Sequence, residues 1–420
     1  MTGETPIDIA HHVLSELAII LAICTAVGAI ARKIKIPDIV LYLLIGMTVG
    51  PTGLGWINVP ADGTLNQAIL IFGAAYLVFD GGASLSLKIL QKVWITIVVI
   101  ATVGILITGA ISATAAYYAM GVPVLVAMLI GAVIASTDPA TLVPIFKQVP
   151  IRDTVSQTVM SESAFNDAMG AIATFAIVAV ALGSGEFSAS KAVLDLGYKA
   201  GVGAIIGIFT GIFLVFMVSK KKIGLFSGYS SVFKIVSILC AFLFSEHIGA
   251  SGFMAVFILG IVVGNKHLLG AQFEEEDQVE FEGFVGVFAL MMRMFIFLLL
   301  GSQVNFELMN QYLVGGVIVS LVLMFIARPI TVFACCLPDR RANWSMNEML
   351  FMCWTRETGV IPAALAGILV GMKVPGAEQV AAVTFIAILM TIIIQASTTP
   401  WLAKKLGLLK FGKDDIPTLG

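Results

Sequence analysis

The chain has 420 residues and a formal net charge of −2; 59% of its residues are hydrophobic, whereas only 12% are charged. A soluble globular domain carries about a quarter charged residues and interrupts its apolar stretches more often. Apolar runs of about 18 or more residues recur here from one end of the chain to the other, which is typical of membrane spans. The composition therefore excludes an ordinary soluble protein and predicts an integral membrane protein surrounded by the lipid bilayer, with no nucleic-acid partner.

The apolar runs predict an all-α polytopic membrane protein of about thirteen transmembrane helices. The loops between these runs are too short to hold a soluble domain, so residues 1–420 are expected to form a single transmembrane domain. The expected spans lie near residues 12–31, 37–50, 65–83, 93–118, 122–146, 154–182, 193–218, 230–247, 250–265, 283–303, 312–337, 346–371 and 378–403.

Basic residues are distributed unevenly between alternate loops. With these spans, seventeen Lys and Arg residues fall in one set of loops and in the C-terminal segment, and three fall in the opposite set. Cytoplasmic loops carry an excess of Lys and Arg, and a wrong helix count would scramble such a bias. The sequence thus predicts a multi-pass protein of the cytoplasmic membrane, with its N-terminus outside and its C-terminus in the cytoplasm.

The longest cytoplasmic loop carries a run of acidic residues, Glu274–Asp277. Two interpretations are open, namely a solvated face and a regulatory sensor of pH or cations. A charge run is more often a solvated face, and this is the interpretation that we adopt.

Two of the apolar spans are interrupted by polar residues and proline. The fifth reads IASTDPATLVPIF, with Thr137, Asp138 and Pro139 at its middle, and the twelfth reads WTRETGVIPAALAG, with Arg356 and Glu357 inside it. The two spans lie seven apart, and an odd offset reverses the direction through the membrane, so they predict an inverted repeat with two broken helices that cross. Paired interruptions of this kind point to a transporter site near the middle of the bilayer.

Ionisable residues stand inside several of the spans. A charged side chain at the centre of a span costs about 2.5–3.5 kcal/mol on insertion scales, so its presence favours a function. The alternative for each residue is an ion pair that holds two helices together. The embedded residues are Asp80, Asp138, Glu162, Asp167, Lys234, Arg293, Arg328, Arg356 and Glu357.

The sixth span contains the sequence SESAFNDAMG. Ser163 and Asp167 are four residues apart and share one face of a helix. Glu162 and Asn166 form a second stripe about 100° away around the helix axis. The two stripes are therefore expected to meet different partners.

Oxygen ligands for a cation are expected where the fifth and sixth spans meet. Pro139 removes a backbone donor, which leaves carbonyl groups near Thr137 free to face a cation beside Asp138. Together with Ser163 and Asp167 they form a cage of oxygen atoms, which suits Na⁺, Li⁺ or K⁺ better than a transition metal. Burial and a neighbouring carboxylate both favour the protonated carboxyl. A proton and a cation are therefore expected to compete for Asp167, which gives antiport without a cofactor.

The motifs S-T-D-P-A in the fifth span and E-S-x-x-N-D in the sixth resemble those of the monovalent cation:proton antiporter-1 family, the NhaP-type sodium/proton antiporters. The resemblance covers nearly the whole chain in length, helix count and orientation. It implies a core that moves against a dimerisation domain, and hence a homodimer. The core helices would lie in residues 65–182 and 283–403, and the dimerisation helices among residues 12–50 and 193–265.

The resemblance also implies roles for individual residues of the two motifs. Asp138 and Asp167 are the expected acidic pair, with Asp167 binding the ion. Ser163 and Thr137 would ligate the same Na⁺, and Asn166 would order the site. The order Asn166–Asp167 resembles that of electroneutral exchangers, so one proton is expected for one cation.

Members of the family pair the motif glutamate with an arginine on a later helix, and Glu162 and Arg328 match these positions. The two residues are expected to form a structural ion pair. Asp80 matches an acidic position that approaches the site in some members, and it is a further candidate ligand. Many members carry G-L-R-G-A in the twelfth span, whereas this chain has TRETGVIP, with Arg356 displaced and Glu357 added. Glu357 is expected to pair with Arg356 or, alternatively, to alter the ion selectivity.

Other functions fit the sequence less well. A potassium/proton antiporter on the same scaffold would differ only in the cation that competes with protons. A channel would need a filter-like carbonyl loop such as TVGYG, and a proton-coupled symporter for an organic solute would need a roomier polar cavity. The sequence shows no nucleophile–histidine pair, nucleotide-binding loop or zinc motif, so an enzyme is not expected.

Overall fold

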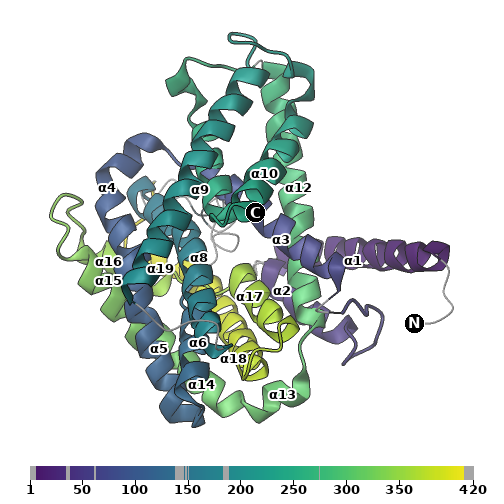
Figure 1. Ribbon diagram of the computed structural model, residues 1–420, viewed down its shortest axis with the longest axis vertical. Helices are drawn as coiled ribbons and strands as arrows, with labels where there is room; N and C mark the ends of the chain where they lie inside the picture. Colours follow the sequence, from purple (N-terminus) through teal and green to yellow (C-terminus); the bar gives the residue numbers. More distant parts are fainter. Residues whose placement is uncertain are drawn as a thin grey trace.

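The computed structural model describes residues 6–34, 38–60, 63–137, 146, 149, 151–182, 189–273 and 275–410. Over these residues the secondary structure is helical without a β-strand, apart from one isolated bridge between Ile151 and Leu409. In Figure 1, α9, α10 and the start of α12 rise above the other helices, and α1 extends away to one side. The all-α fold class is confirmed.

The helices of the first half are α1 (Pro6–Ile34), α2 (Asp38–Val49), α3 (Thr64–Ala83), α4 (Leu87–Val99), α5 (Ile105–Met120), α6 (Val124–Ile134), α8 (Asp153–Ala181) and α9 (Ala189–Val218). Those of the second half are α10 (Ser230–His247), α11 (Gly252–Gly264), α12 (Glu275–Ser302), α13 (Phe306–Gln311), α14 (Leu313–Val322), α15 (Arg328–Cys336), α16 (Met346–Trp354), α17 (Val360–Gly371), α18 (Ala377–Met390) and α19 (Ser397–Lys405). Three π-helical segments join neighbouring helices into longer rods, namely η1 (Ile100–Gly104), η4 (Leu323–Ala327) and η5 (Thr391–Ala396).

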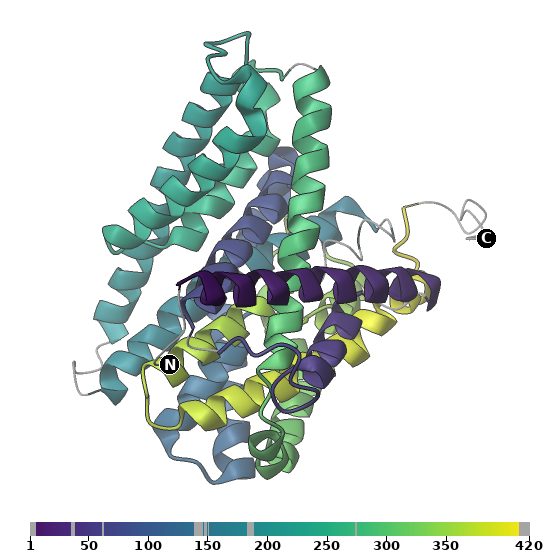
Figure 2. The ribbon, with the colours of Figure 1, turned by 90° about the vertical axis from the view of Figure 1, so that its right-hand side faces the viewer.

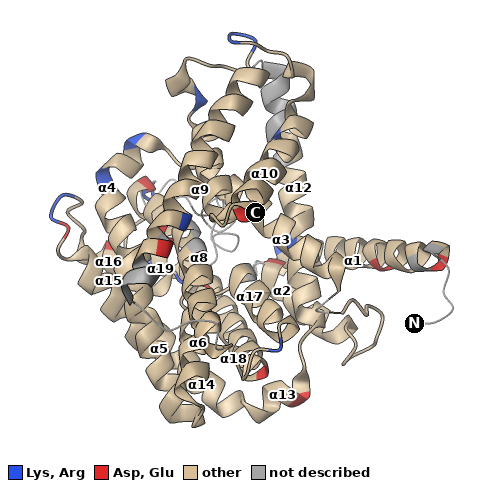
Figure 3. Ribbon diagram, in the orientation of Figure 1, with Lys and Arg blue, Asp and Glu red and all other residues tan. Residues whose placement is uncertain are grey.

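The apolar helices match the predicted spans one for one. Eight helical segments among the described residues are long and apolar enough to cross a membrane, and five shorter apolar helices fall in the remaining predicted spans. Charged residues lie mostly at helix ends and in loops (Figure 3). The prediction of a polytopic protein with about thirteen transmembrane helices is therefore confirmed.

The helices pack as two groups. In the first group α1, α2 and α3 contact α9 to α12, with extensive contacts of α3 with α11 and of α2 with α12. In the second group α4, α5, α6 and α8 contact α14 to α19. Figure 2 shows α1 running across α12 at the outside of the first group. The groups meet mainly where α8 and α17 pack on α3, and where α8 packs on α11.

Small residues allow helices within each group to approach closely, which is the usual means of association in lipid. A Cβ atom on Gly131 of α6 would lie 2.3 Å from the carbonyl oxygen of Gly109 on α5. A Cβ atom on Gly260 of α11 would lie 2.4 Å from the carbonyl oxygen of Phe79 on α3. Any larger residue at either position would force the two backbones apart.

The described chain leaves the regular helix at both predicted interruptions. In the fifth span the regular helix α6 ends at Ile134, and Ser136 and Thr137 have a non-helical backbone. The twelfth span divides into α16 and α17, with a non-helical segment over residues 355–359. The helix α12 begins at Glu275, so most of the acidic run belongs to its first turn; the side chains of that run lie outside the described residues.

Candidate ion-binding site

The helix α8 carries the centre of the site. It has 29 residues, and Asp153 in its first turn is favourable there because a carboxylate interacts well with the positive end of a helix. Asp167 lies near the middle of this helix and is 0% exposed. A carboxylate buried at mid-span is costly unless other groups interact with it, so the neighbours of Asp167 decide its role.

The end of α6 supplies hydroxyl groups to this face of α8. The Ser136 hydroxyl donates a hydrogen bond of 2.6 Å to Oδ1 of Asp167. The Thr137 hydroxyl donates one of 2.9 Å to the hydroxyl oxygen of Ser163, one turn before Asp167. All four residues are buried. Asp138, the next residue of the motif, lies outside the described residues.

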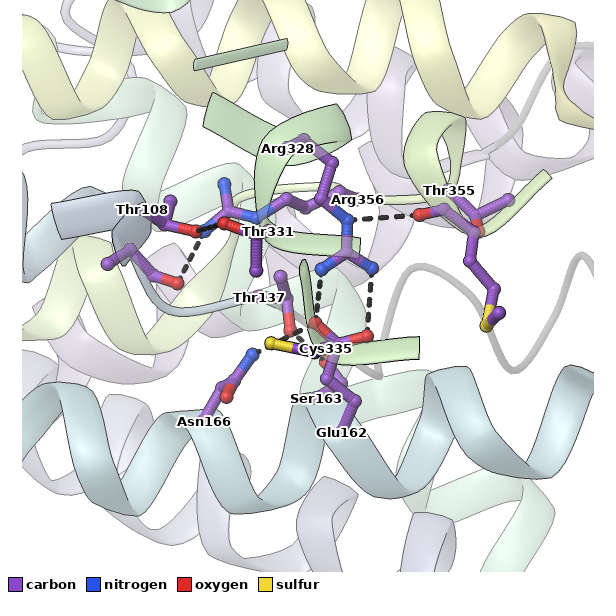
Figure 4. A network of polar contacts seen from close by, with 12 residues as sticks. Thr108, Thr137, Glu162, Ser163, Asn166, Arg328, Thr331, Cys335, Thr355 and Arg356 are labelled. Carbon is purple, nitrogen blue, oxygen red and sulfur yellow. Dashed lines mark hydrogen bonds and ion pairs between the residues drawn. The ribbon is translucent and has the colours of Figure 1, made fainter. Parts of the chain in front are cut away.

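The second stripe of α8 faces a different helix, α15. Arg328 is 1% exposed, and its Nη2 donates a hydrogen bond of 2.8 Å to Oε2 of Glu162, while its Nη1 pairs with Oε1. Arg328 Nε donates to the backbone carbonyl of Met352 at 3.0 Å. Asn166 Nδ2 donates to Oε1 of Glu162 at 3.3 Å. Figure 4 shows the fork of Arg328 aimed at Glu162, with Asn166 and Ser163 beside them.

The break between α16 and α17 brings a second arginine to the site. Arg356 is 2% exposed, and its Nη2 donates to the carbonyl oxygens of Ile134, at 3.3 Å, and of Ala135. These carbonyls lie at the C-terminal end of α6, where a cation is favourable because the helix dipole leaves negative charge there. The two interrupted spans therefore meet, with Arg356 joining the second break to the end of α6.

Two other residues of this break are held in the interior. The backbone N–H of Thr358 donates to the Thr391 hydroxyl at 3.1 Å, which fixes the segment to the π-helical turn η5. Glu357 is 0% exposed, and its charge interacts favourably with that of Arg356. Arg356 thus donates its described hydrogen bonds to carbonyl oxygens at the end of α6, and the carboxylate of Glu357 adds an electrostatic interaction.

The arrangement suits a small hard cation. Carboxylate and hydroxyl oxygens of Asp167, Ser163, Thr137 and Ser136 converge on the end of α6, and such ligands favour alkali-metal cations over transition metals. Glu162 is already neutralised by Arg328, so the carboxylate of Asp167 is the group on α8 that can exchange a proton for a cation.

The structure brings most of the predicted residues that it describes together. Asp167, Ser163 and Thr137 form one cluster, with Glu162, Asn166 and Arg328 immediately beside it. Asp80 lies on α3, in the other helix group, and its charge acts on Lys234 of α10.

The sequence motif also contained a contact that was not predicted. Ser136 stands directly before Thr137 in the S-T-D-P-A motif, yet only the structure shows that its hydroxyl binds Asp167. The sequence does contain a signal for this contact, because Ser136 is a polar residue next to the interruption of the fifth span. A linear motif does not reveal which of two adjacent hydroxyls points at a given carboxylate.

Comparisons with known proteins agree with this geometry. The family model described as "Sodium/hydrogen exchanger, transmembrane" matches residues 18–405. The Na(+)/H(+) antiporter 1 of Methanocaldococcus jannaschii is 30% identical, and the match covers 94% of this chain and 95% of that protein. The K(+)/H(+) antiporter NhaP of Alkalimonas amylolytica is 26% identical over 90% of this chain and 64% of its own length.

The fold is also similar to a solved structure. The sodium proton antiporter MjNhaP1 from Methanocaldococcus jannaschii gives a TM-score of 0.78 at 28% sequence identity, with 98% of this chain and 100% of that chain covered. The family match extends over nearly all of the transmembrane helices, including both interrupted spans and the cluster around Asp167. The chain therefore belongs to the sodium/hydrogen exchanger family of transmembrane proteins.

Proposed function

We propose that this protein is a sodium/proton antiporter of the cytoplasmic membrane, in which Na⁺ and H⁺ compete for Asp167. The single observation that carries the proposal is the fully buried carboxylate of Asp167, which meets the hydroxyls at the end of the interrupted fifth span. The relatives named as sodium/proton antiporters support Na⁺ as the cation. Li⁺ is proposed as a second substrate because oxygen ligands suit small alkali-metal cations.

In this mechanism the cation is held by oxygen atoms alone. Asp167 supplies the charge, Ser163 and Thr137 supply neutral oxygen ligands, and Asp138 is proposed as the second carboxylate on the basis of the motif. Asn166, held by Glu162, keeps the adjacent turn of α8 in place. When Asp167 takes up a proton, its affinity for a cation is lost, so each ligand displaces the other and no cofactor is required.

The same scheme gives the stoichiometry. Glu162 stays paired with Arg328 throughout, so Asp167 alone changes its occupant between the two half-cycles. One proton then crosses for each Na⁺, and exchange moves no net charge. The order Asn166–Asp167 supports this electroneutral proposal.

Alternating access requires one part of the protein to move against another. The two helix groups, which meet mainly along α3, α8, α11 and α17, support a moving core and a fixed partner. This packing favours a boundary between the moving and the fixed part that the chain crosses between α3 and α4, and again between α12 and α14. Among the eight long spans, α1 is the least buried, because only 22% of the residues in its most apolar 18-residue stretch lie inside the protein. The exposure of α1 supports a homodimer in which a second copy of the chain covers part of the first helix group.

The orientation follows from the basic loops. Lys88 and Lys92 before the middle of α4, and Lys220 to Lys222 after α9, lie on the same side as the end of α19. The positive-inside rule supports a cytoplasmic location for that side, with the N-terminus outside.

A potassium/proton antiporter is the second candidate. Relatives named as K(+)/H(+) antiporters are also similar to this chain, and Glu357 places an additional buried carboxylate beside Arg356 at the second break. An extra carboxylate near the cage would change the ligand field that separates K⁺ from Na⁺.

The test is exchange in proteoliposomes that carry an imposed pH gradient, with Na⁺, Li⁺, K⁺ or choline added in turn. The wild type, Asp167→Asn and the control Asp195→Asn, which changes an exposed acid on α9, are compared. Collapse of the gradient by Na⁺ or Li⁺, lost in Asp167→Asn and retained in Asp195→Asn, supports the proposal. Collapse by K⁺ alone assigns the second candidate, and exchange that survives in Asp167→Asn refutes the role of this carboxylate.

A further inference from the structure

The chain changes direction directly after α19. Gly407 adopts a left-handed conformation, with φ at +69°, and the N–H of Leu408 donates back to the carbonyl oxygen of Ala403 at 3.0 Å. This is a common way to end a helix. The residues around this turn, Leu406–Lys410, are named the C-terminal segment. Instead of continuing α19, this segment lies against the starts of α8 and α16.

The C-terminal segment contacts the start of α8 through its backbone and through one side chain. The N–H of Arg152 donates to the carbonyl oxygen of Leu408 at 3.1 Å, and the neighbouring residues of both segments form the isolated antiparallel bridge. Lys410 Nζ lies 2.9 Å from Oδ1 of Asp153, in the first turn of α8. Arg152 carries the contact on to α16, because its Nη1 lies 3.4 Å from Oε1 of Glu348. The start of α8 is therefore joined both to the end of α19 and to α16.

The same part of the chain contacts α16 at both of its ends. At the start of α16, Asn347 Nδ2 donates to the carbonyl oxygen of Leu406 at 3.1 Å. At its end, Trp354 Nε1 donates to the hydroxyl of Thr398 on α19 at 2.7 Å. The two helices are therefore antiparallel, and the C-terminal segment makes the contact at the end of α16 that is farther from the second break.

An apolar side chain anchors the C-terminal segment. Leu408 is 1% exposed and belongs to a buried cluster that also contains Val155 of α8 and Phe351 of α16, which are both 0% exposed. Burial of a leucine side chain is favourable because it removes apolar surface from water. Leu408 thus holds the segment between the two helices. The ion pair of Lys410 and Asp153 lies at the surface, with side chains that are 45% and 47% exposed.

Both helices lead directly to the candidate ion-binding site. Asp167 lies fourteen residues after Asp153 on the same helix, which is about 21 Å along a regular α-helix. The carbonyl oxygen of Met352 on α16 accepts a hydrogen bond from Arg328, and the second break, with Arg356, follows the end of α16. A shift at the start of either helix would therefore change the spacing between Asp167 and the two arginines.

We propose that the C-terminal segment is a positioning element for exchange, which holds the starts of α8 and α16 at the spacing that gives Asp167 its affinity for the cation. This inference rests on the proposed antiport. It makes Leu408 and Lys410 positioning residues that act from the start of α8 and not as ligands. A segment that only stabilises the fold would change the amount of folded protein and the maximal rate, without changing the half-saturating Na⁺ concentration.

The experiment measures the half-saturating Na⁺ concentration and the maximal rate of exchange by the full-length protein in proteoliposomes at one fixed pH. Lys410→Glu places a second negative charge beside Asp153, and the double variant Lys410→Glu/Asp153→Lys restores an attractive pair with the signs exchanged. Lys404→Glu is the matched control, because it makes the same change of charge at an exposed residue of α19. Leu408→Asn removes the apolar anchor, and Leu408→Met retains it.

Loss of these contacts lowers the fraction of molecules that hold the competent spacing, and the apparent affinity falls in proportion to that fraction. We expect Lys410→Glu to raise the half-saturating concentration about threefold and Leu408→Asn about tenfold, which correspond to competent fractions of about one third and one tenth. The double variant should return most of the way to the wild-type concentration. Leu408→Met and Lys404→Glu should keep the wild-type concentration.

Unchanged half-saturating concentrations in Lys410→Glu and Leu408→Asn, with only the maximal rates reduced, would overturn the proposal and leave a structural segment. A double variant as impaired as Lys410→Glu would also contradict it, because the effect would then not come from the pair with Asp153. If Leu408→Asn does not fold, Lys410→Glu and its double variant decide the question, because they change only groups that are about half exposed.

Failure of the proposed antiport has a different signature, because wild-type vesicles would then show no cation-dependent collapse of the gradient. Hydrogen–deuterium exchange of the purified protein needs no transport and still tests the positioning. The backbone N–H of Thr358, in the second break, donates to Thr391. Faster exchange of peptides that cover residues 355–359 in Lys410→Glu than in Lys404→Glu supports the proposal, and equal exchange refutes it.

Discussion

The buried pair of Glu162 and Arg328 predicts a large loss of stability when one partner is removed. The side chains are 2% and 1% exposed, and Arg328 makes two bonds to the carboxylate and one to the carbonyl of Met352. Arg328→Met leaves a carboxylate buried without its counter-ion, which typically costs about 3–5 kcal/mol. The double variant Glu162→Gln/Arg328→Met removes both charges and should lose much less. The control Arg152→Met breaks a pair of 3.4 Å with Glu348 in which the arginine side chain is 54% exposed, so the expected loss is only about 0–1 kcal/mol.

The assay is unfolding of the detergent-solubilised protein by denaturant, followed by tryptophan fluorescence. The electrostatic reasoning would be refuted if Arg328→Met had the same free energy of unfolding as the wild type. It would also be refuted if the double variant were no more stable than Arg328→Met. Exchange by the double variant supplies a second readout. If Glu162 were a ligand of the cation, the folded double variant would lose its dependence on Na⁺, whereas a structural pair predicts that this dependence survives.

Three further changes test other parts of the structure. Ser136→Ala removes a hydrogen bond to Asp167, and leaving a buried acceptor unpaired costs ~1–3 kcal/mol. The half-saturating Na⁺ concentration should therefore rise about tenfold, and an unchanged concentration in a flux assay would contradict this prediction. Gly131→Ala should destabilise the protein by ~1–3 kcal/mol in the same unfolding assay because its Cβ would meet a carbonyl oxygen on α5, whereas Gly197→Ala, which meets open space, should have little effect. Arg356→Met removes the donor to the carbonyls at the end of α6 and should abolish most exchange while the folded protein still elutes as a single species; near-normal rates would show that these contacts are dispensable.

The transmembrane helices could be predicted from the sequence because apolar runs and turn residues are local signals. The span expected near residues 230–247 coincides with α10, and the interruption after Trp354 falls where α16 ends. Spacing on one helix was equally informative. Ser163 and Asp167 share one face of α8 and Glu162 and Asn166 share another, as a four-residue separation requires.

Contacts between distant segments could not be derived from periodicity. The charges of Arg356 and its neighbour Glu357 interact favourably, in line with the expected pair. The hydrogen bonds of Arg356 to the end of α6, more than 200 residues earlier in the chain, were not predicted. Lys234 was recognised only as a charge inside a span. Its proximity to Asp80 depends on how α10 packs against α3, which no linear pattern specifies.

The pairing of Glu162 with Arg328 also constrains how the protein is made. The two residues are separated by 166 positions. Translation adds ~5–20 residues per second, so α8 waits on the order of ten seconds before the codon for Arg328 is read. The most apolar 18-residue stretch of α8 has a mean hydropathy of 1.6, against 2.5 for that of α9, and α8 contains three carboxyl groups, those of Asp153, Glu162 and Asp167. A nascent chain that stalls before α15 would therefore hold Glu162 inside a membrane span without the arginine that neutralises it in the folded protein.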